Sequence, residues 1–107
     1  MRQHHDLAAY EELQAALASG LVSEIRGILE AAGLRGSKLQ TTVASIASSV
    51  ADIYDGSAHV QAKNDYLVPI LGFAIGRMRT RLLVPEEGGS SVHEFIPGAV
   101  SSEFGAQ

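Results

Sequence analysis

Apolar residues recur at steps of three and four along the first third of the chain, as on one face of an α-helix. Asp6 can cap the first turn with its carboxylate, and Gly33 suits the left-handed residue that ends a helix. The pattern predicts one helix from about Asp6 to Ala32, or two if Ser19 and Gly20 break it. The phase is kept across Gly20, which favours one helix. The stripe consists of Leu7, Tyr10, Leu13 or Gln14, Leu17, Leu21, Ile25, Ile28 and Ala32.

Such a helix is long for a chain of 107 residues. At 1.5 Å per residue it spans roughly 40 Å, whereas a compact domain of about 100 residues has a radius of gyration near 13 Å. A second copy of the chain would cover the part of this helix that the rest of the same chain does not reach. We therefore expect self-association through Leu7, Tyr10, Leu17, Leu21, Ile25 and Ile28.

A second amphipathic helix follows a short connection. Ser37 and Gln40 fit a capping box at its start, and Asp55-Gly56 marks its end. The segment 33–38 holds glycines and a lysine but lacks the spacing of a phosphate-binding loop, so we interpret it as an interhelical turn. The apolar positions of this helix are Leu39, Val43, Ile46, Val50 and Ile53.

The apolar period then changes from that of a helix to that of strands. Arginines alternate with apolar residues up to Val84, which predicts a strand with one wet face. Pro69 argues against a helix interior in the apolar run before it, and Gly76 suits a tight turn. We predict an antiparallel meander of strands 58–62, 66–75 and 78–84, with a fourth short strand at 92–96.

Two helices followed by a meander predict an α+β domain in which the helices cover one face of the sheet. The alternative is an all-α four-helix bundle in which residues 65–83 are helical. We expect a flexible N-terminus over residues 1–6, a single domain over 7–96 and a flexible C-terminal tail over 97–107.

Composition narrows the class of protein. The chain is 46% hydrophobic and 19% charged, which argues against disorder. Its net charge of -4 disfavours a nucleic-acid coat or a polybasic membrane contact. The chain has no cysteine, which excludes a disulfide framework and a thiolate metal site. It shows neither a signal-peptide core nor a run of about 20 apolar residues, so we expect a cytoplasmic protein, of bacterial or phage origin.

The best acid–base and metal-ligating residue types are His59, His93 and Glu94. They would form a site only if strands 58–62 and 92–96 were neighbours. His4 and His5, next to Asp6, also have metal-ligand chemistry, but adjacent residues at a chain end rarely form a rigid site. We expect no cofactor.

Arg77, Arg79 and Arg81 form a one-sided stripe on the strand predicted at 78–84. Such a stripe can contact an anion or an acidic partner through bidentate pairs, or enter a DNA groove. The acidic balance of the chain counts against nucleic acid.

No motif in the sequence indicates a particular reaction or ligand. The leading hypothesis is a non-enzymatic, homo-oligomeric interaction module, with a dimer as the first expectation. One alternative is a small-ligand or metal-binding enzyme-like domain that uses His59, His93 and Glu94. The other is a DNA-binding regulator that uses Arg77, Arg79 and Arg81.

Overall fold

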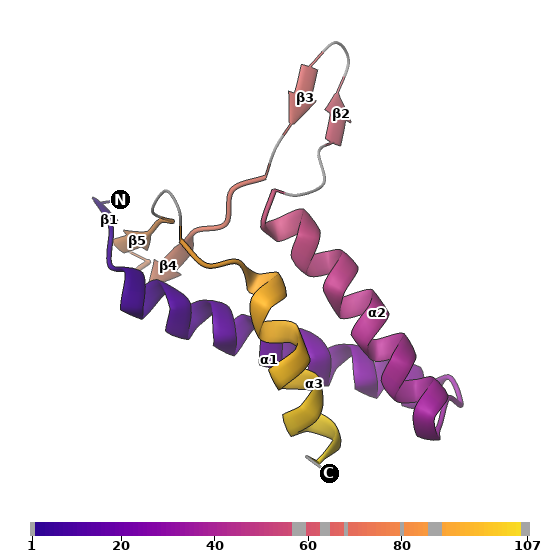
Figure 1. The fold of residues 1–107 in the computed structure, drawn as a ribbon. Coiled ribbons are helices and arrows are strands. Elements are labelled where there is room, and N and C mark those ends of the chain that lie inside the picture. Colours follow the sequence, from indigo (N-terminus) through magenta and orange to yellow (C-terminus); the bar gives the residue numbers. More distant parts are fainter. Residues whose placement is uncertain are drawn as a thin grey trace.

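The chain adopts an α+β fold, as the sequence predicts (Figure 1). The computed structural model describes residues 2–56, 60–62, 65–67, 69–79, 81–85 and 89–105. The elements, in chain order, are β1 (Arg2–His4), α1 (Leu7–Ala31), α2 (Gly36–Tyr54), β2 (Val60–Ala62), β3 (Asp65–Leu67), β4 (Phe73–Ile75), β5 (Arg81–Leu83), the 3₁₀ helix η1 (Val92–Phe95) and α3 (Ile96–Phe104). The four-helix alternative is wrong, because the described parts of 65–83 contain β3, β4 and β5.

α1 is one continuous helix, so the two-helix alternative is wrong. Asp6 caps it as predicted, with Oδ1 accepting a hydrogen bond from the Ala9 N–H at 3.1 Å. Gly33 ends it with a φ of 101°, a conformation that costs glycine little. The cost of Gly20 inside the helix, about 1 kcal/mol relative to alanine, is small beside the packing energy of a helix of this length.

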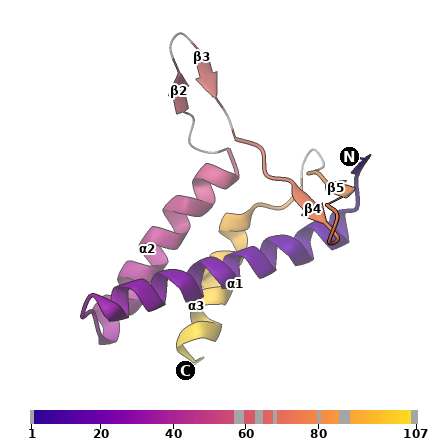
Figure 2. The ribbon, with the colours of Figure 1, turned by 180° about the vertical axis from the view of Figure 1, so that it is seen from behind.

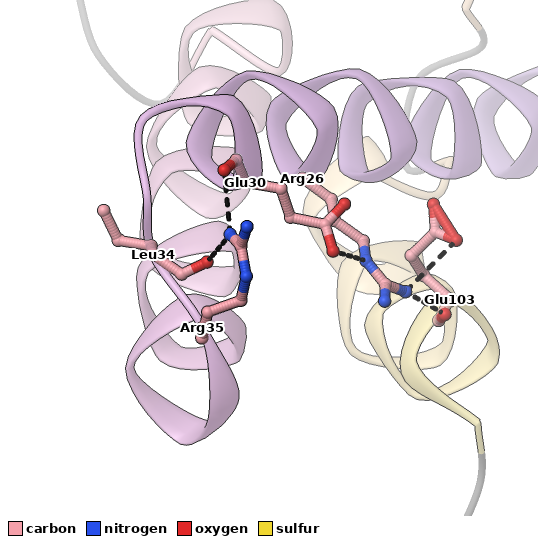
Figure 3. Close-up of polar contacts among 5 residues, drawn as sticks. All are labelled: Arg26, Glu30, Leu34, Arg35 and Glu103. Carbon is pink, nitrogen blue, oxygen red and sulfur yellow. Dashed lines mark hydrogen bonds and ion pairs between the residues drawn. The ribbon is translucent and has the colours of Figure 1, made fainter.

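α2 begins two residues earlier than the predicted capping box implies. Its N-cap is Arg35, whose side chain makes no cap hydrogen bond, and Ser37 lies inside the helix. The Arg35 guanidinium instead donates through Nη1 to the carbonyls of Glu30 and Leu34, at 2.8 and 2.7 Å (Figure 3). The last carbonyls of a helix have no intrahelical donor, so Arg35 stabilises the end of α1 rather than the start of α2.

The hydrophobic core lies where the three helices meet. α2 and α3 pack on the same side of α1, which crosses them in both views (Figures 1 and 2). Buried positions on α1 and α2 recur every four residues: Tyr10, Gln14, Ala18 and Val22 on α1, and Leu39, Val43, Ala47 and Ala51 on α2. η1 and α3 close this core with Val92, Ile96, Ala99 and Val100.

Residues 97–104, which the sequence predicted as part of a flexible tail over 97–107, belong to α3. Pro97 stands in the first turn of α3, where its missing N–H costs nothing. Ala99 and Val100 are buried against α1 and α2. The sequence predicted a tail here because the glycine, the alanine and the serines of residues 97–104 carry little apolar area. Their small size nevertheless suits a close contact between helices.

Arg26 ties the end of α3 to α1 (Figure 3). Its Nη1 donates to the Glu103 carbonyl at 2.6 Å, and its guanidinium lies 4.4 Å from the centroid of the Phe104 ring. The Glu30 carboxylate lies 3.4 Å from Nε on the other side. This one side chain therefore combines a hydrogen bond, a cation–π contact and an ion pair at the end of α3.

The main sheet has the order β1-β5-β4 and lies beside the first turns of α1 (Figure 1). β4 and β5 are antiparallel, joined by the predicted turn at Gly76, which has a φ of 91°. β1 pairs in parallel with β5, so that Arg2 is in register with Arg81. Residues 2–4, expected to be flexible, are thus the edge strand of this sheet.

The predicted meander is wrong in its connections. β2 and β3 form a separate hairpin that projects away from the helices (Figures 1 and 2). The run predicted as one strand over 66–75 is divided into β3 and β4, with Pro69 between them. The strand predicted at 92–96 is η1 and the start of α3. The helices pack mainly on each other, rather than covering a sheet face as expected.

Val100 gives a direct test of the α3 packing. We expect Val100→Asp to lower the free energy of unfolding by about 3 kcal/mol or more, because it buries an unpaired charge. Ser101 is exposed on the same helix, so Ser101→Asp is the matched control and should change stability by less than about 0.5 kcal/mol. Urea unfolding followed by circular dichroism measures both; equal effects would mean that α3 does not pack as described.

Candidate functional site

A pocket of about 400 Å³ lies where the first half of α1, the end of α2 and two connecting segments meet. Residues 69–71 and 89–91 form the part of its wall that comes from these segments. The side chains that bear its chemistry are Tyr10, Gln14, Tyr54, Asp55 and Ser90.

Tyr10 is the central aromatic residue of this pocket. It is 4% exposed, and its hydroxyl donates to the Leu71 carbonyl at 2.6 Å. Its ring meets Phe73 edge to face, with the centroids 5.4 Å apart. Burial raises the pKa of the Tyr10 hydroxyl, and the negative charge of Asp55 raises it further. Tyr10 therefore acts as a neutral donor that joins α1 to β4 and the segment before it.

Gln14 is the one buried polar side chain among the described residues, at 2% exposure. Its Nε2 donates to the Ser90 carbonyl at 2.9 Å, and its Oε1 accepts from the Ser90 hydroxyl at 2.6 Å. Both ends of the amide are thus paired, as burial requires. The reciprocal pair holds residues 89–91 against α1.

Asp55, just beyond α2, holds the start of η1. Its Oδ1 accepts from the Val92 N–H at 2.7 Å, and its Oδ2 from the His93 N–H at 2.9 Å. These are N–H groups of a first helical turn, which have no intrahelical acceptor. Ser91 and Glu94 complete this start as a capping box. The hydrogen bonds of Tyr10, Gln14 and Asp55 are therefore made within the protein, and they fasten Leu71 and the segment 89–95 to the helices.

The predicted histidine site is not assembled in the described part of the chain. His93 pairs through Nδ1 with Asp52, at 2.8 Å, and the Glu94 carboxylate accepts from the Ser91 N–H. His59 lies outside the described residues. Among the residues that are described, no three histidine or acidic side chains are grouped so as to hold a metal ion.

The three arginines are exposed but do not share a strand. Arg77 and Arg79 lie in the turn between β4 and β5, and only Arg81 lies on a strand. Arg79 has a φ of 52°, which the turn imposes. No ion pair involving these three arginines occurs within the described residues. The structure thus brings them to one end of the molecule, without the regular stripe that the sequence predicted.

The residues expected to mediate self-association divide into four groups. Tyr10 belongs to the pocket, while Leu17 and Ile25 pack partly against the core. Leu21 is half-buried. Leu7 and Ile28 are 40% and 60% exposed. The side chains that are free to meet a partner are therefore only part of the predicted stripe.

Sequence reasoning missed the fastening role of Asp55 and Ser91. One signal was present, since Ser91-Val92-His93-Glu94 has the spacing of a capping box before an apolar pair. The Gln14–Ser90 pair joins residues 76 positions apart, and no local pattern announces such a contact.

Comparison with known proteins gives no functional assignment. No protein-family model matches the chain. No curated protein and no solved structure shows significant similarity to it. None of the helices in the described ranges is sufficiently long and apolar to span a membrane.

Asp55 and Asp52 form a matched pair for testing the fastening of η1. We expect Asp55→Ala to lower the free energy of unfolding by about 1–3 kcal/mol, because two N–H groups lose their acceptor. Asp52→Ala breaks only a pair whose side chains are 43% and 51% exposed and should cost less than about 1 kcal/mol. Urea unfolding compares them, and the reverse order would contradict this role of Asp55.

Tyr10 predicts a change in stability at alkaline pH. Because folding raises the pKa of Tyr10, the unfolded chain loses this proton at a lower pH than the folded one. The contribution of Tyr10 is therefore complete below about pH 10 and is lost as the pH rises through the folded-state pKa. We expect stability to fall less between about pH 9 and pH 11 in Tyr10→Phe than in the wild type. Parallel curves would contradict this coupling.

Proposed function

We propose that the protein is a non-enzymatic interaction module that forms a homodimer through one apolar face of α1 and α2. This open face consists of Leu17, Leu21 and Ile28 on α1 and of Ile46, Val50 and Ile53 on α2. The observation that carries the proposal is the exposure of large apolar side chains there: Ile28 is 60%, Ile53 45% and Ile46 38% exposed.

Helix geometry places these residues on one side of the helix pair. Five of the six directly precede a residue that packs in the core, as Leu21 precedes Val22 and Ile46 precedes Ala47. A step of one residue turns a helix by about 100°. α1 and α2 are consecutive helices that run in opposite directions, so the same turn brings both sets to the same face. α3 packs on the buried stripes themselves and leaves this face open.

The surface area of the chain supports the same proposal. A folded monomer of 11.3 kDa is expected to expose roughly 5,700 Å², whereas this chain exposes 7200 Å². The excess of about 1,500 Å² exceeds the roughly 800 Å² that each partner buries in a standard interface. The projecting β2–β3 hairpin (Figure 1) contributes to this excess beside the open face. The radius of gyration is also large, at 15.5 Å against about 13 Å.

A second copy of the chain suits the open face because all six of its residues are uncharged and apolar. A two-fold axis through such a face brings apolar residues against one another, with the exposed Glu24, between Leu21 and Ile28, at the edge of the face. The arginines beside β5 lie at the other end of α1 and remain exposed for a further partner. Neither alternative function gains comparable support, since His93 and Glu94 bond within the protein and Arg77 and Arg79 stand in a turn.

Ile28 and Ser23 provide the test of the dimer. Both residues are exposed on α1, and Ser23 is turned about 140° away from Ile28. We expect the wild type and Ser23→Lys to sediment as dimers at micromolar concentration, and Ile28→Lys to sediment as a folded monomer, because a lysine at the interface would bury an unpaired charge. A monomeric wild type would overturn the proposed function. A dimeric Ile28→Lys would show that another surface pairs the subunits.

A further inference from the structure

A second cavity, of about 240 Å³, lies between the N-terminal residues and the β4–β5 hairpin. His4, His5 and Arg81 line it, together with the apolar side chains of Ile75 and Leu83. The parallel pairing of β1 with β5 assembles this wall, since it joins residues almost 80 positions apart in the chain. The hydrogen bond from the Val84 N–H to the His4 carbonyl, at 3.0 Å, continues the pairing at the cavity.

Positive charge is concentrated around this cavity. The described residues of the sheet, its turn and the start of α1, 2–6, 71–79 and 81–85, contain four arginines, two histidines and one carboxylate, that of Asp6. The whole chain has 8 basic and 12 acidic residues, so the rest keeps 8 − 4 = 4 basic residues against 12 − 1 = 11 acidic ones, a net charge of −7. The sheet end is therefore basic on an otherwise acidic protein, which favours an anion at this place.

One ring nitrogen of His4, a residue that lines the cavity, lacks a partner. His4 Nε2 is buried and makes no hydrogen bond with a described protein group. Buried side-chain nitrogens are nearly always paired, so the His4 imidazole keeps hydrogen-bonding capacity that the described protein groups do not use. Asp6, the one carboxylate that lines the cavity, caps α1 by accepting from the Ala9 N–H.

We propose that this cavity binds a small phosphate-bearing ligand. Arg81 supplies a planar fork of donors that matches two phosphate oxygens, and the two imidazoles supply N–H donors for the others. Ile75 and Leu83 form an apolar wall for the organic part of a phosphomonoester. A metal ion does not fit, because the described residues hold no metal-ligating cluster and Arg81 would repel a cation. The site is independent of the dimer face.

The test is a nuclear magnetic resonance titration at about pH 6. The probes are inorganic phosphate, phenyl phosphate and acetate, each added at constant ionic strength. We expect saturable shifts of the His4 and His5 imidazole signals with both phosphates, tighter for phenyl phosphate, and no saturation with acetate. Absence of saturation with either phosphate would overturn the proposal, as would equal binding of acetate.

Variants locate the binding. Arg81 and Arg77 are both exposed, but only Arg81 lines the cavity. We expect Arg81→Gln and His4→Gln to weaken phenyl phosphate binding about tenfold or more, as for the loss of a charge-assisted hydrogen bond. Arg77→Gln is the matched control and should retain the wild-type affinity. Equal weakening by Arg77→Gln would show that the anion responds to the general charge of this end and would overturn the site.

Discussion

Close contact between helices at three alanines determines how the rest of the molecule is built. Ala18, Ala47 and Ala51 have no exposed surface, and they line the surfaces on which α3 packs. Small side chains allow helix axes to approach closely. They also bury little apolar area, so the core is tight but small. Ile46, one residue before Ala47, lies at the surface.

Because the core is small, hydrogen bonds contribute a larger share of the energy that holds the segments together. The segments after α2 are joined to the helices by particular hydrogen bonds: Tyr10 to the Leu71 carbonyl, Gln14 to Ser90, and Asp55 to the start of η1. Arg26 likewise joins the end of α3 to α1 through its hydrogen bond to the Glu103 carbonyl. Each bond contributes only about 1 kcal/mol net, but breaking one of them leaves a buried group unpaired at greater cost. The register of α3 on the alanine surface therefore depends on contacts outside the apolar core.

The two proposed binding surfaces lie on different parts of the same long helix. The open face lies on α1 from Leu17 onward and on α2, whereas the basic cavity lies beside the first turns of α1, where β1 meets β5. α1 is thus the scaffold that separates them. A dimer formed through the open face would present two basic ends to solvent.

The sequence alone determined the two long helices and the ends of α1, because caps, period and breaking residues act locally: Asp6 caps α1, Gly33 ends it, and the apolar steps continue past Gly20. It also indicated Gly76 as a turn. Only the tertiary structure decided which side of each stripe is buried, since Gln14 and Ala18 pack inside while Ile28 does not. It also decided that residues 97–104 are helical and that residues 2–4 pair with β5. These outcomes depend on partners far away in the chain. Such long-range contacts do not show in the pattern of apolar and polar residues of a short segment.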